Sequence, residues 1–114
     1  MSENPRELLM GTLELLVLKA LSLEPMHGWG LAQRIEQMSR EIFQVSQGSL
    51  YPALQRMKRK GWIRSEWRVT ANNRRARYYL LTRAGERQLE REKEDWERAY
   101  RAVNWVLASK GSTP

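Results

Sequence analysis

The sequence predicts a mainly helical fold with a small β-hairpin, namely a winged helix-turn-helix followed by a long C-terminal dimerisation helix. A helix with one apolar and one basic edge, beginning near Ser46, leads directly into two segments of strand formers. A turn rich in asparagine and arginine joins these segments, and a long helical pattern with an apolar heptad stripe follows them. At 114 residues there is room for one small domain, so a partner subunit is expected to cover part of its apolar surface.

The first predicted helix runs from Glu7 to Leu23 and is apolar on nearly every side. Its apolar residues include Leu8, Leu9, Met10, Leu13, Leu15, Leu16, Val17, Leu18 and Leu21. One small domain does not easily surround such a helix. We therefore expect a second subunit to cover it, with Leu8 and Leu16 at the interface.

The second predicted helix spans Gly28 to about Arg40, after a break at residues 24–26 that contains Pro25. It would be the first helix of the helix-turn-helix. Three of its side chains are expected to face inward: Leu31, Ile35 and Met38. In the connection that follows, Ile42 and Phe43 are expected to plug the core.

The third predicted helix has one buried face, because Leu50, Leu54 and Met57 recur at the i, i+4, i+7 spacing. Its start is open between two caps, Ser46 and Ser49. With Ser46 as the cap, Pro52 lies beyond the first turn and removes a helical hydrogen bond, whereas with Ser49 it sits harmlessly at the third position. Residues 60–61, Lys-Gly, are typical of a helix C-terminus.

The predicted hairpin consists of strands at residues 62–69 and 77–81, joined by a turn at residues 70–75. Positive charge is concentrated in this part of the chain. From Arg56 to Arg77 there are nine Lys or Arg against one acid, Glu66. A solvated surface helix would show the same helical pattern, but the basic hairpin beside it favours a nucleic-acid interface.

Double-stranded DNA is the predicted partner, in keeping with a formal net charge of +7 from 20 Lys and Arg against 13 Asp and Glu. The outward helix face carries groups suited to base edges, namely Gln47, Ser49 and Tyr51, with the flat surface of Pro52 beside a groove wall. Cations suited to phosphates are Arg56, Lys58 and Arg59. The hairpin would hold the flanking backbone or minor groove through Asn72, Asn73, Arg74, Arg75 and Arg77.

The last predicted helix runs from about Arg83 to Ala108, with Thr82 as its N-cap. Leu89, Trp96 and Val103 are seven residues apart, with Tyr100 and Leu107 at the matching second core position and Lys93 interrupting the stripe. Mixed charges cover the other faces. Such a stripe on a terminal helix is typical of a dimerisation surface.

Several segments together resemble the PadR-type transcriptional regulators of bacteria. They are His27-Gly28-Trp29-Gly30, Gly48-Ser49-Leu50-Tyr51-Pro52-Ala53-Leu54, Gly61-Trp62-Ile63, Arg77-Tyr78-Tyr79-Leu80-Leu81-Thr82 and Ala84-Gly85. They follow the family's order and spacing, and the likeness spans roughly residues 8–107. The resemblance implies a dimeric winged-helix repressor that binds a palindromic operator and is released by a small molecule.

Trp96 has two interpretations. It is a dimer-interface aromatic, or, by resemblance to a multidrug-binding member of the family, it sandwiches a flat aromatic effector with its symmetry mate, with Tyr100 and Trp105 lining the same cavity. The remaining tryptophans, at positions 29, 62 and 67, are expected to pack in the core or at the base of the hairpin.

Other classes of protein find little support. The sequence has no cysteine, which excludes disulfides, zinc fingers and thiol catalysis. The single histidine, His27, has no metal ligands at a suitable spacing and no catalytic partners in the sequence. It is expected to shape the turn before the second helix. We expect no enzyme activity, no cofactor and no metal. The N-terminal apolar run is too polar for a membrane span and lacks a signal-peptide pattern, so a bacterial cytoplasmic protein, bound to the nucleoid through its operator, is expected.

The predicted organisation is a DNA-binding domain at residues 1–82 and a dimerisation helix at 83–108, which form one compact unit with helix 7–23. The main alternative is a winged-helix protein interaction module without specific DNA binding. Whether duplex DNA competes for the basic face would discriminate between the two.

Overall fold

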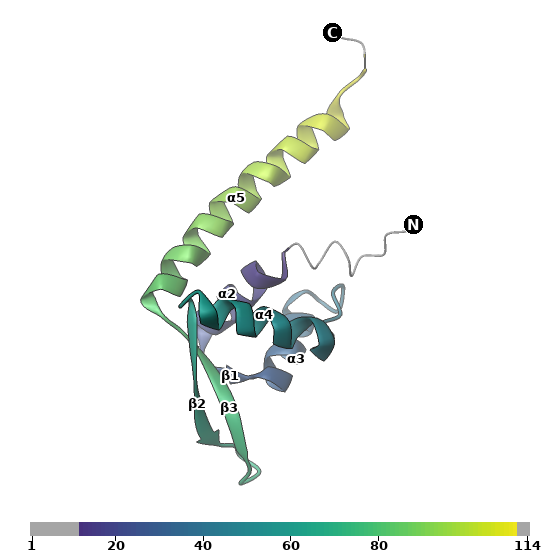
Figure 1. Ribbon diagram of the computed structural model, residues 1–114. Coiled ribbons are helices and arrows are strands. Elements are labelled where there is room, and N and C mark those ends of the chain that lie inside the picture. Colours follow the sequence, from purple (N-terminus) through teal and green to yellow (C-terminus); the bar gives the residue numbers. More distant parts are fainter. Residues whose placement is uncertain (1–11, 112–114) are drawn as a thin grey trace.

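Helices make up most of the computed structural model, which describes residues 12–111, and three short strands form one sheet (Figure 1). The elements in chain order are α2 (Leu13–Leu23), β1 (Met26–His27), α3 (Gly28–Met38), α4 (Gln47–Arg59), β2 (Ile63–Val69), β3 (Arg75–Leu81) and α5 (Arg83–Ala108). The predicted mainly helical fold with a hairpin and a long terminal helix is confirmed. Helix α2 begins at Leu13, with Thr12 at its N-cap position, and the predicted start at Glu7 and the predicted interface residue Leu8 lie outside the described residues.

The sheet is antiparallel, in the order β1-β3-β2, so the predicted hairpin has a third strand. Strand β1 consists of two residues, with Met26 opposite Tyr79 and His27 opposite Tyr78. The long hairpin of β2 and β3 runs in register from Ile63 opposite Leu81 to the pair of Val69 and Arg75. It extends away from the helices and forms the wing (Figure 1).

The core lies where α2, α3 and α4 meet the base of the sheet. Its largest fully buried side chains are Leu13, Val17, Leu18, Leu31, Leu50, Leu54, Met57 and Ile63. Helix α2 is largely enclosed within one protomer, although Leu15 and Leu16 are only partly buried and Leu23 is exposed. The predicted inward faces of α3 and α4 are thus confirmed for Leu31, Ile35, Leu50, Leu54 and Met57.

Two apolar residues near the end of α3 were expected inside but face solvent. Met38 is 42% exposed and Ile42 is 71% exposed. For Ile42 the cause is a left-handed turn, because Arg40 and Glu41 have φ angles of 55° and 66°, which reverse the chain and carry Ile42 outward, whereas Met38 ends α3 before this turn. Phe43 is partly buried, as expected, and Val45 fills the core beside it.

Helix α5 starts on the body of the protein and then leaves it (Figure 1). Leu89 is buried, whereas the residues from Lys93 to the end of the helix are exposed. The overall dimensions of 63 × 29 × 22 Å reflect this projecting helix. Within residues 12–111, no helix combines the length and the apolar character needed to cross a lipid bilayer.

Candidate nucleic-acid interface

Helix α4 begins after Ser46, which settles the choice between the two predicted caps. The Ser46 hydroxyl accepts a hydrogen bond from the Ser49 backbone N–H at 3.2 Å, and its extended backbone is that of an N-cap. Pro52 therefore lies inside the helix, where it has no N–H to donate to the carbonyl of Gly48. Both residues are exposed, so water can reach that carbonyl.

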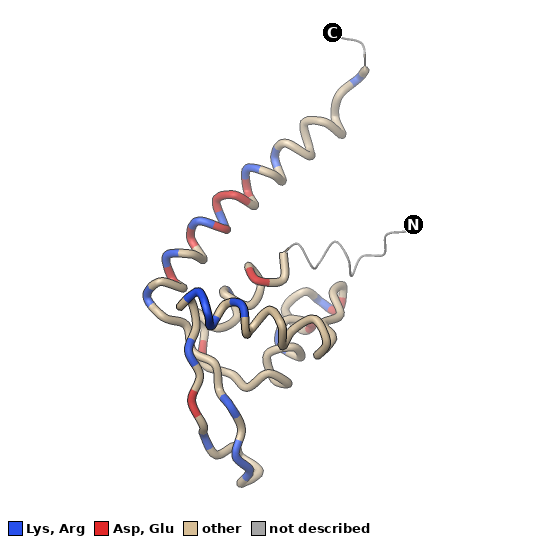
Figure 2. Tube along the Cα trace, in the orientation of Figure 1, with Lys and Arg blue, Asp and Glu red and all other residues tan. Residues whose placement is uncertain are grey.

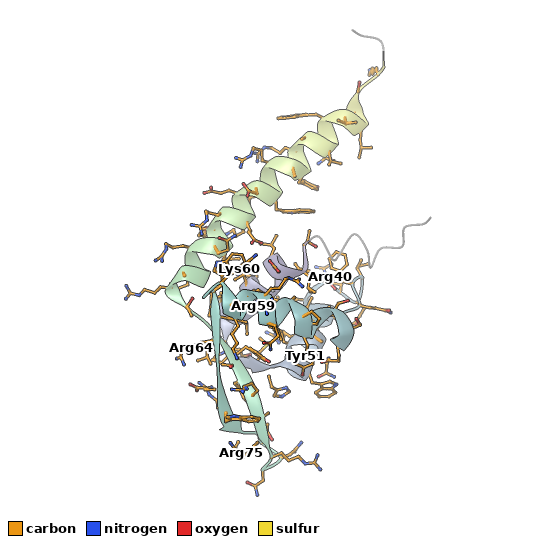
Figure 3. All side chains as sticks on the ribbon, viewed as in Figure 1. Arg40, Tyr51, Arg59, Lys60, Arg64 and Arg75 are labelled. Atoms are coloured by element: carbon orange, nitrogen blue, oxygen red, sulfur yellow. The ribbon has the colours of Figure 1, made fainter. Side chains whose placement is uncertain are left out.

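The outward face of α4 is polar. Opposite the buried leucines lie Pro52, Gln55 and Arg59, all exposed, and Figure 3 shows Arg59 and Lys60 at the C-terminal end of the helix. Within the described part of the chain, Arg59 forms no ion pair. Gln47 and Lys58 are exposed and Ser49 is partly exposed, so the structure leaves these predicted DNA ligands accessible.

Tyr51, a predicted base contact, is partly committed to packing. Its ring lies against Gly28 of α3, so closely that a Cβ on this glycine would approach the tyrosine hydroxyl to 2.5 Å. Burial first, and the charge of Tyr51 second, raise the pKa of Tyr79 on β3. Tyr51 thus joins α4 to α3 while 41% of its surface stays exposed, and Figure 3 shows its place on α4.

Arg56, a predicted phosphate ligand, already has an anionic partner within the protein. Its Nε atom lies 3.1 Å from Oε2 of Glu14 on α2. On the α4 helix this side chain is therefore on the flank that faces α2. Sequence reasoning missed the pair because its members are 42 residues apart.

The wing ends in a tight turn that presents polar and basic side chains. The Asn73 N–H donates to the Thr70 carbonyl at 2.9 Å, and the Thr70 N–H donates to the Arg74 carbonyl at 2.7 Å. Asn73 adopts a φ of 62°, a conformation that asparagine tolerates well. Asn72, Asn73 and Arg74 are all exposed at the tip, as predicted, and Arg75 starts β3 beside them (Figure 3).

One face of the wing continues the basic surface of α4. The Lys58 ammonium and the Arg77 guanidinium both donate to the Ser65 hydroxyl, at 3.3 and 3.4 Å. Arg77 and Arg75 each lie 4.8 Å from the centre of the Trp67 ring. We call this series the basic band, and its members are Lys58, Ser65, Trp67, Arg75 and Arg77.

The opposite face of the wing is partly neutralised. Glu66 pairs with Arg68 at 2.7 Å and with Arg64 at 3.2 Å. Hydrogen bonds from Arg68 first, and from Arg64 second, lower the pKa of Glu66. Since side chains alternate along a strand, Glu66 lies on the other side from Ser65 and Trp67, and the basic band keeps its positive charge. Figure 2 shows this single acid among the basic residues of the wing.

The predicted packing roles of the tryptophans hold only for Trp62, which is partly buried beneath Lys60. Trp67 is 54% exposed and Trp29 is 61% exposed. His27 shapes the start of α3, as predicted, because its Nδ1 atom accepts the Gly30 N–H at 3.0 Å, and its ring stacks on Trp29. Among residues 12–111, no cluster of three His, Asp or Glu side chains could hold a metal ion.

A second feature is a cleft of about 580 Å³ between α2, α4 and α5. Its lining residues are Thr12, Glu14, Leu15, Arg56, Gln88, Glu92, Asp95 and Trp96. Trp96 is 48% exposed, and its ring lies 6.4 Å from that of Tyr100, its neighbour on α5. The ion pair of Glu14 and Arg56 thus borders the same space as the predicted effector residue.

The predicted dimerisation residues divide into two groups. Leu89 packs in its own protomer's core, and Leu16 is packed at the edge of that core, so neither is a free interface residue. Trp96, Tyr100, Val103 and Leu107 are each about half exposed or more. Trp105 and Val106 add to this apolar surface, at 70% and 73% exposed.

Comparisons with known proteins agree with this geometry. Residues 17–91 match the model of the transcriptional regulator PadR-like family. A PadR-like transcriptional regulator from Bacillus cereus is 30% identical, with a TM-score of 0.79 over 91% of this chain and 99% of that one. A PadR family regulator from Eggerthella lenta is 29% identical, with a TM-score of 0.79 over 91% and 88% of the two chains. A regulator from Clostridium thermocellum, at 22% identity, shares the fold with a TM-score of 0.78 over 86% and 95%.

Proposed function

Because the chain belongs to the PadR-like family of transcriptional regulators, we propose that it is a repressor that binds an inverted-repeat operator as a homodimer. The family is one of DNA-binding regulators and not of enzymes. The observation that carries the proposal is the basic band, which extends the open face of α4 onto the wing. A helix and a hairpin that share one continuous basic surface are suited to bind a DNA major groove and the phosphate backbone beside it.

In the proposed complex the roles of the side chains follow from their positions. Gln47 and Ser49, at the N-terminal end of α4, read base edges, and Pro52 lies close to the groove wall. Lys58 and Arg59 bind phosphates, and the wing holds the flanking DNA through Asn72, Asn73, Arg74, Arg75 and Arg77. Arg56 contributes to the position of α4 through Glu14.

The homodimer is supported by the exposed apolar stripe of α5. A surface of this kind, with tryptophan, tyrosine and aliphatic side chains in water, is unfavourable for an isolated protomer. Residues 83–108 would form the dimer contact and residues 1–82 the DNA-binding part. Two recognition helices would then enter successive major grooves about 34 Å apart, which requires an inverted repeat.

Release by a small aromatic or hydrophobic effector is a further part of the proposal. The cleft beside Trp96 supports it, because it offers an aromatic wall together with polar groups in a space of about 580 Å³. An effector acts there only if it prefers one arrangement of the two protomers over the other. A repressor of this type works in the bacterial cytoplasm, on the nucleoid.

The test is fluorescence anisotropy of the protein with labelled fragments from upstream of its own gene, and with random duplex, over several salt concentrations. We expect binding to one fragment that exceeds binding to random duplex by about 10³-fold or more, with a steep salt dependence. Absence of binding to any duplex at low salt would overturn the proposal. It would favour a protein interaction module with an acidic partner instead.

A further inference from the structure

Trp67 occupies an unusual position for a large aromatic residue. It lies in the middle of β2, on the extended part of the wing, and 54% of its surface is exposed. It does not belong to the hydrophobic core. Packing within the domain therefore does not account for a tryptophan at this place.

The contacts of Trp67 are with cations. Arg77 is its directly paired residue on β3, and Arg75 lies two residues before Arg77, at the start of the same strand and on the same face. Both guanidinium groups lie 4.8 Å from the ring centre, within the range of a cation–π contact. The strand places the two arginines on one face, where their charges repel each other, and the ring offers both of them a common attractive contact.

No carboxylate competes for these arginines within residues 12–111. The acid of the wing, Glu66, lies on the other face and is engaged by Arg64 and Arg68. Arg75 and Arg77 form no ion pair among the described residues. Their charge therefore stays available while their position is restricted, and the Ser65 hydroxyl links Arg77 to Lys58 of α4.

We propose that Trp67 is a positioning residue of the DNA-binding surface, which holds Arg75 and Arg77 in line with Lys58 before DNA arrives. The proposal rests on the function proposed above. An arginine on an exposed hairpin loses considerable side-chain entropy when a phosphate fixes it. If the ring restricts the two guanidiniums in the free protein, less entropy is lost on binding and the affinity rises. Trp67 thus acts through the arginines and not through a contact of its own with DNA.

The test compares Trp67→Leu, which removes the ring but keeps apolar bulk, with Trp67→Phe, which keeps an aromatic face. We expect Trp67→Leu to weaken duplex binding by about three- to tenfold, because the side chains of Arg75 and Arg77 would then lose more rotamer freedom when DNA fixes them. Trp67→Phe should retain most of the affinity, and thermal unfolding should be nearly unchanged in both. In the double variant R75A/R77A, adding Trp67→Leu should have no further effect, because nothing remains for the ring to position.

A second readout uses the protein without DNA. The side-chain protons of Arg75 and Arg77 should show upfield ring-current shifts in NMR spectra, and Trp67→Leu should abolish them. Equal loss of affinity from Trp67→Leu with and without the two arginines would overturn the positioning role, as would unchanged affinity in Trp67→Leu alone. If R75A/R77A itself leaves duplex binding unchanged, the wing assignment in the proposed function fails, and the positioning role fails with it.

Discussion

Arg56 on α4 and Glu14 on α2 form an ion pair, with 3.1 Å between Nε and Oε2. The pair ties the helix with the open polar face to the helix that packs against α5. Both residues also line the cleft beside Trp96. Arg56 therefore faces α2 and the cleft, while Arg59 on the same helix faces solvent.

This arrangement predicts unequal roles for two arginines on one helix. Arg59→Ala should weaken binding to every duplex alike and lower the slope of log affinity against log salt by about one unit, because one phosphate contact is lost. Arg56→Ala should leave that slope close to the wild-type value. Salt titrations of both variants with the same operator and random duplex make the comparison. A slope reduced equally in both would place Arg56 on the DNA.

The Glu14–Arg56 pair should contribute little to stability. Its side chains are 22% and 45% exposed, and pairs of this kind are worth about 0.2–1 kcal/mol. Glu14→Gln should therefore lower the free energy of unfolding by no more than about 1 kcal/mol. Urea denaturation measures the difference, and the control is Glu97→Gln, at an exposed position of α5 that forms no ion pair among the described residues. A much larger loss would show that the pair is screened from water more than its exposure indicates.

Gly85 at the start of α5 should not accept a side chain. A Cβ there would overlap the carbonyl oxygen of Trp62 and the side chain of Leu81. Gly85→Ala should lower the free energy of unfolding by about 1–3 kcal/mol, as overpacking does. Gly48→Ala is the matched control, since this glycine lies in α4 with open space around it, and the change should stabilise the protein by about 0.5–1 kcal/mol. Denaturant unfolding that showed the same effect at both sites would contradict the close contact.

Thr82 connects the wing to α5 and should be sensitive to loss of its hydroxyl. Its Oγ1 atom accepts the Gly85 N–H at 3.0 Å and lies within donating distance of the carbonyls of Gly61 and Trp62, at 2.6 and 2.9 Å. Thr82→Val keeps the shape but removes these bonds, and it should destabilise the protein by about 1–2 kcal/mol. Thr82→Ser should restore most of the stability in thermal unfolding. If Thr82→Ser were as unstable as Thr82→Val, the methyl group and not the hydroxyl would be responsible.

Val103 tests the proposed dimer surface. It is 55% exposed in the protomer, so Val103→Asp leaves the core intact and introduces a charge into the apolar stripe. We expect the dimer to dissociate and operator affinity to fall, while thermal unfolding of the protomer remains cooperative. Glu94→Gln on a polar face of α5 is the control. Sedimentation velocity over a range of concentrations distinguishes monomer from dimer. A dimer that persists in Val103→Asp would place the interface elsewhere.

Local signals in the sequence predicted much of the fold. Thr82 was identifiable as a cap, and Ser46 as one of two candidates with Ser49, because a cap depends on a hydroxyl near the first helical N–H groups, which is a property of a few neighbouring residues. The end of α4 was predictable for the same reason, since Gly61 adopts a φ of 79°. Strand β1 was missed because two residues carry no alternation.

Exposure and long-range contacts were harder to predict. Trp29 and Trp67 were expected to be packed because tryptophan is usually enclosed, yet their positions depend on how the wing and α3 lie relative to the core. Leu89 belongs to the heptad stripe of α5, but the stripe passes α2 of the same protomer before it reaches open surface. An apolar stripe has the same sequence pattern whether it packs within one protomer or between two, so the pattern alone does not distinguish these contacts.

The burial of Leu89 anchors the base of α5 on the body of the protein, while the helix from Lys93 onward is exposed, so α5 can act as a lever with its fulcrum at Leu89. From Leu89 to Ala108 the helix extends about 28 Å at 1.5 Å per residue. A tilt of about 5° at the fulcrum moves the far end by roughly 2.5 Å, since the displacement grows with this length. In the proposed dimer, where the far ends are joined, the same tilt would instead shift the two bodies and change the span between their recognition helices. The cleft beside Trp96 lies next to that fulcrum.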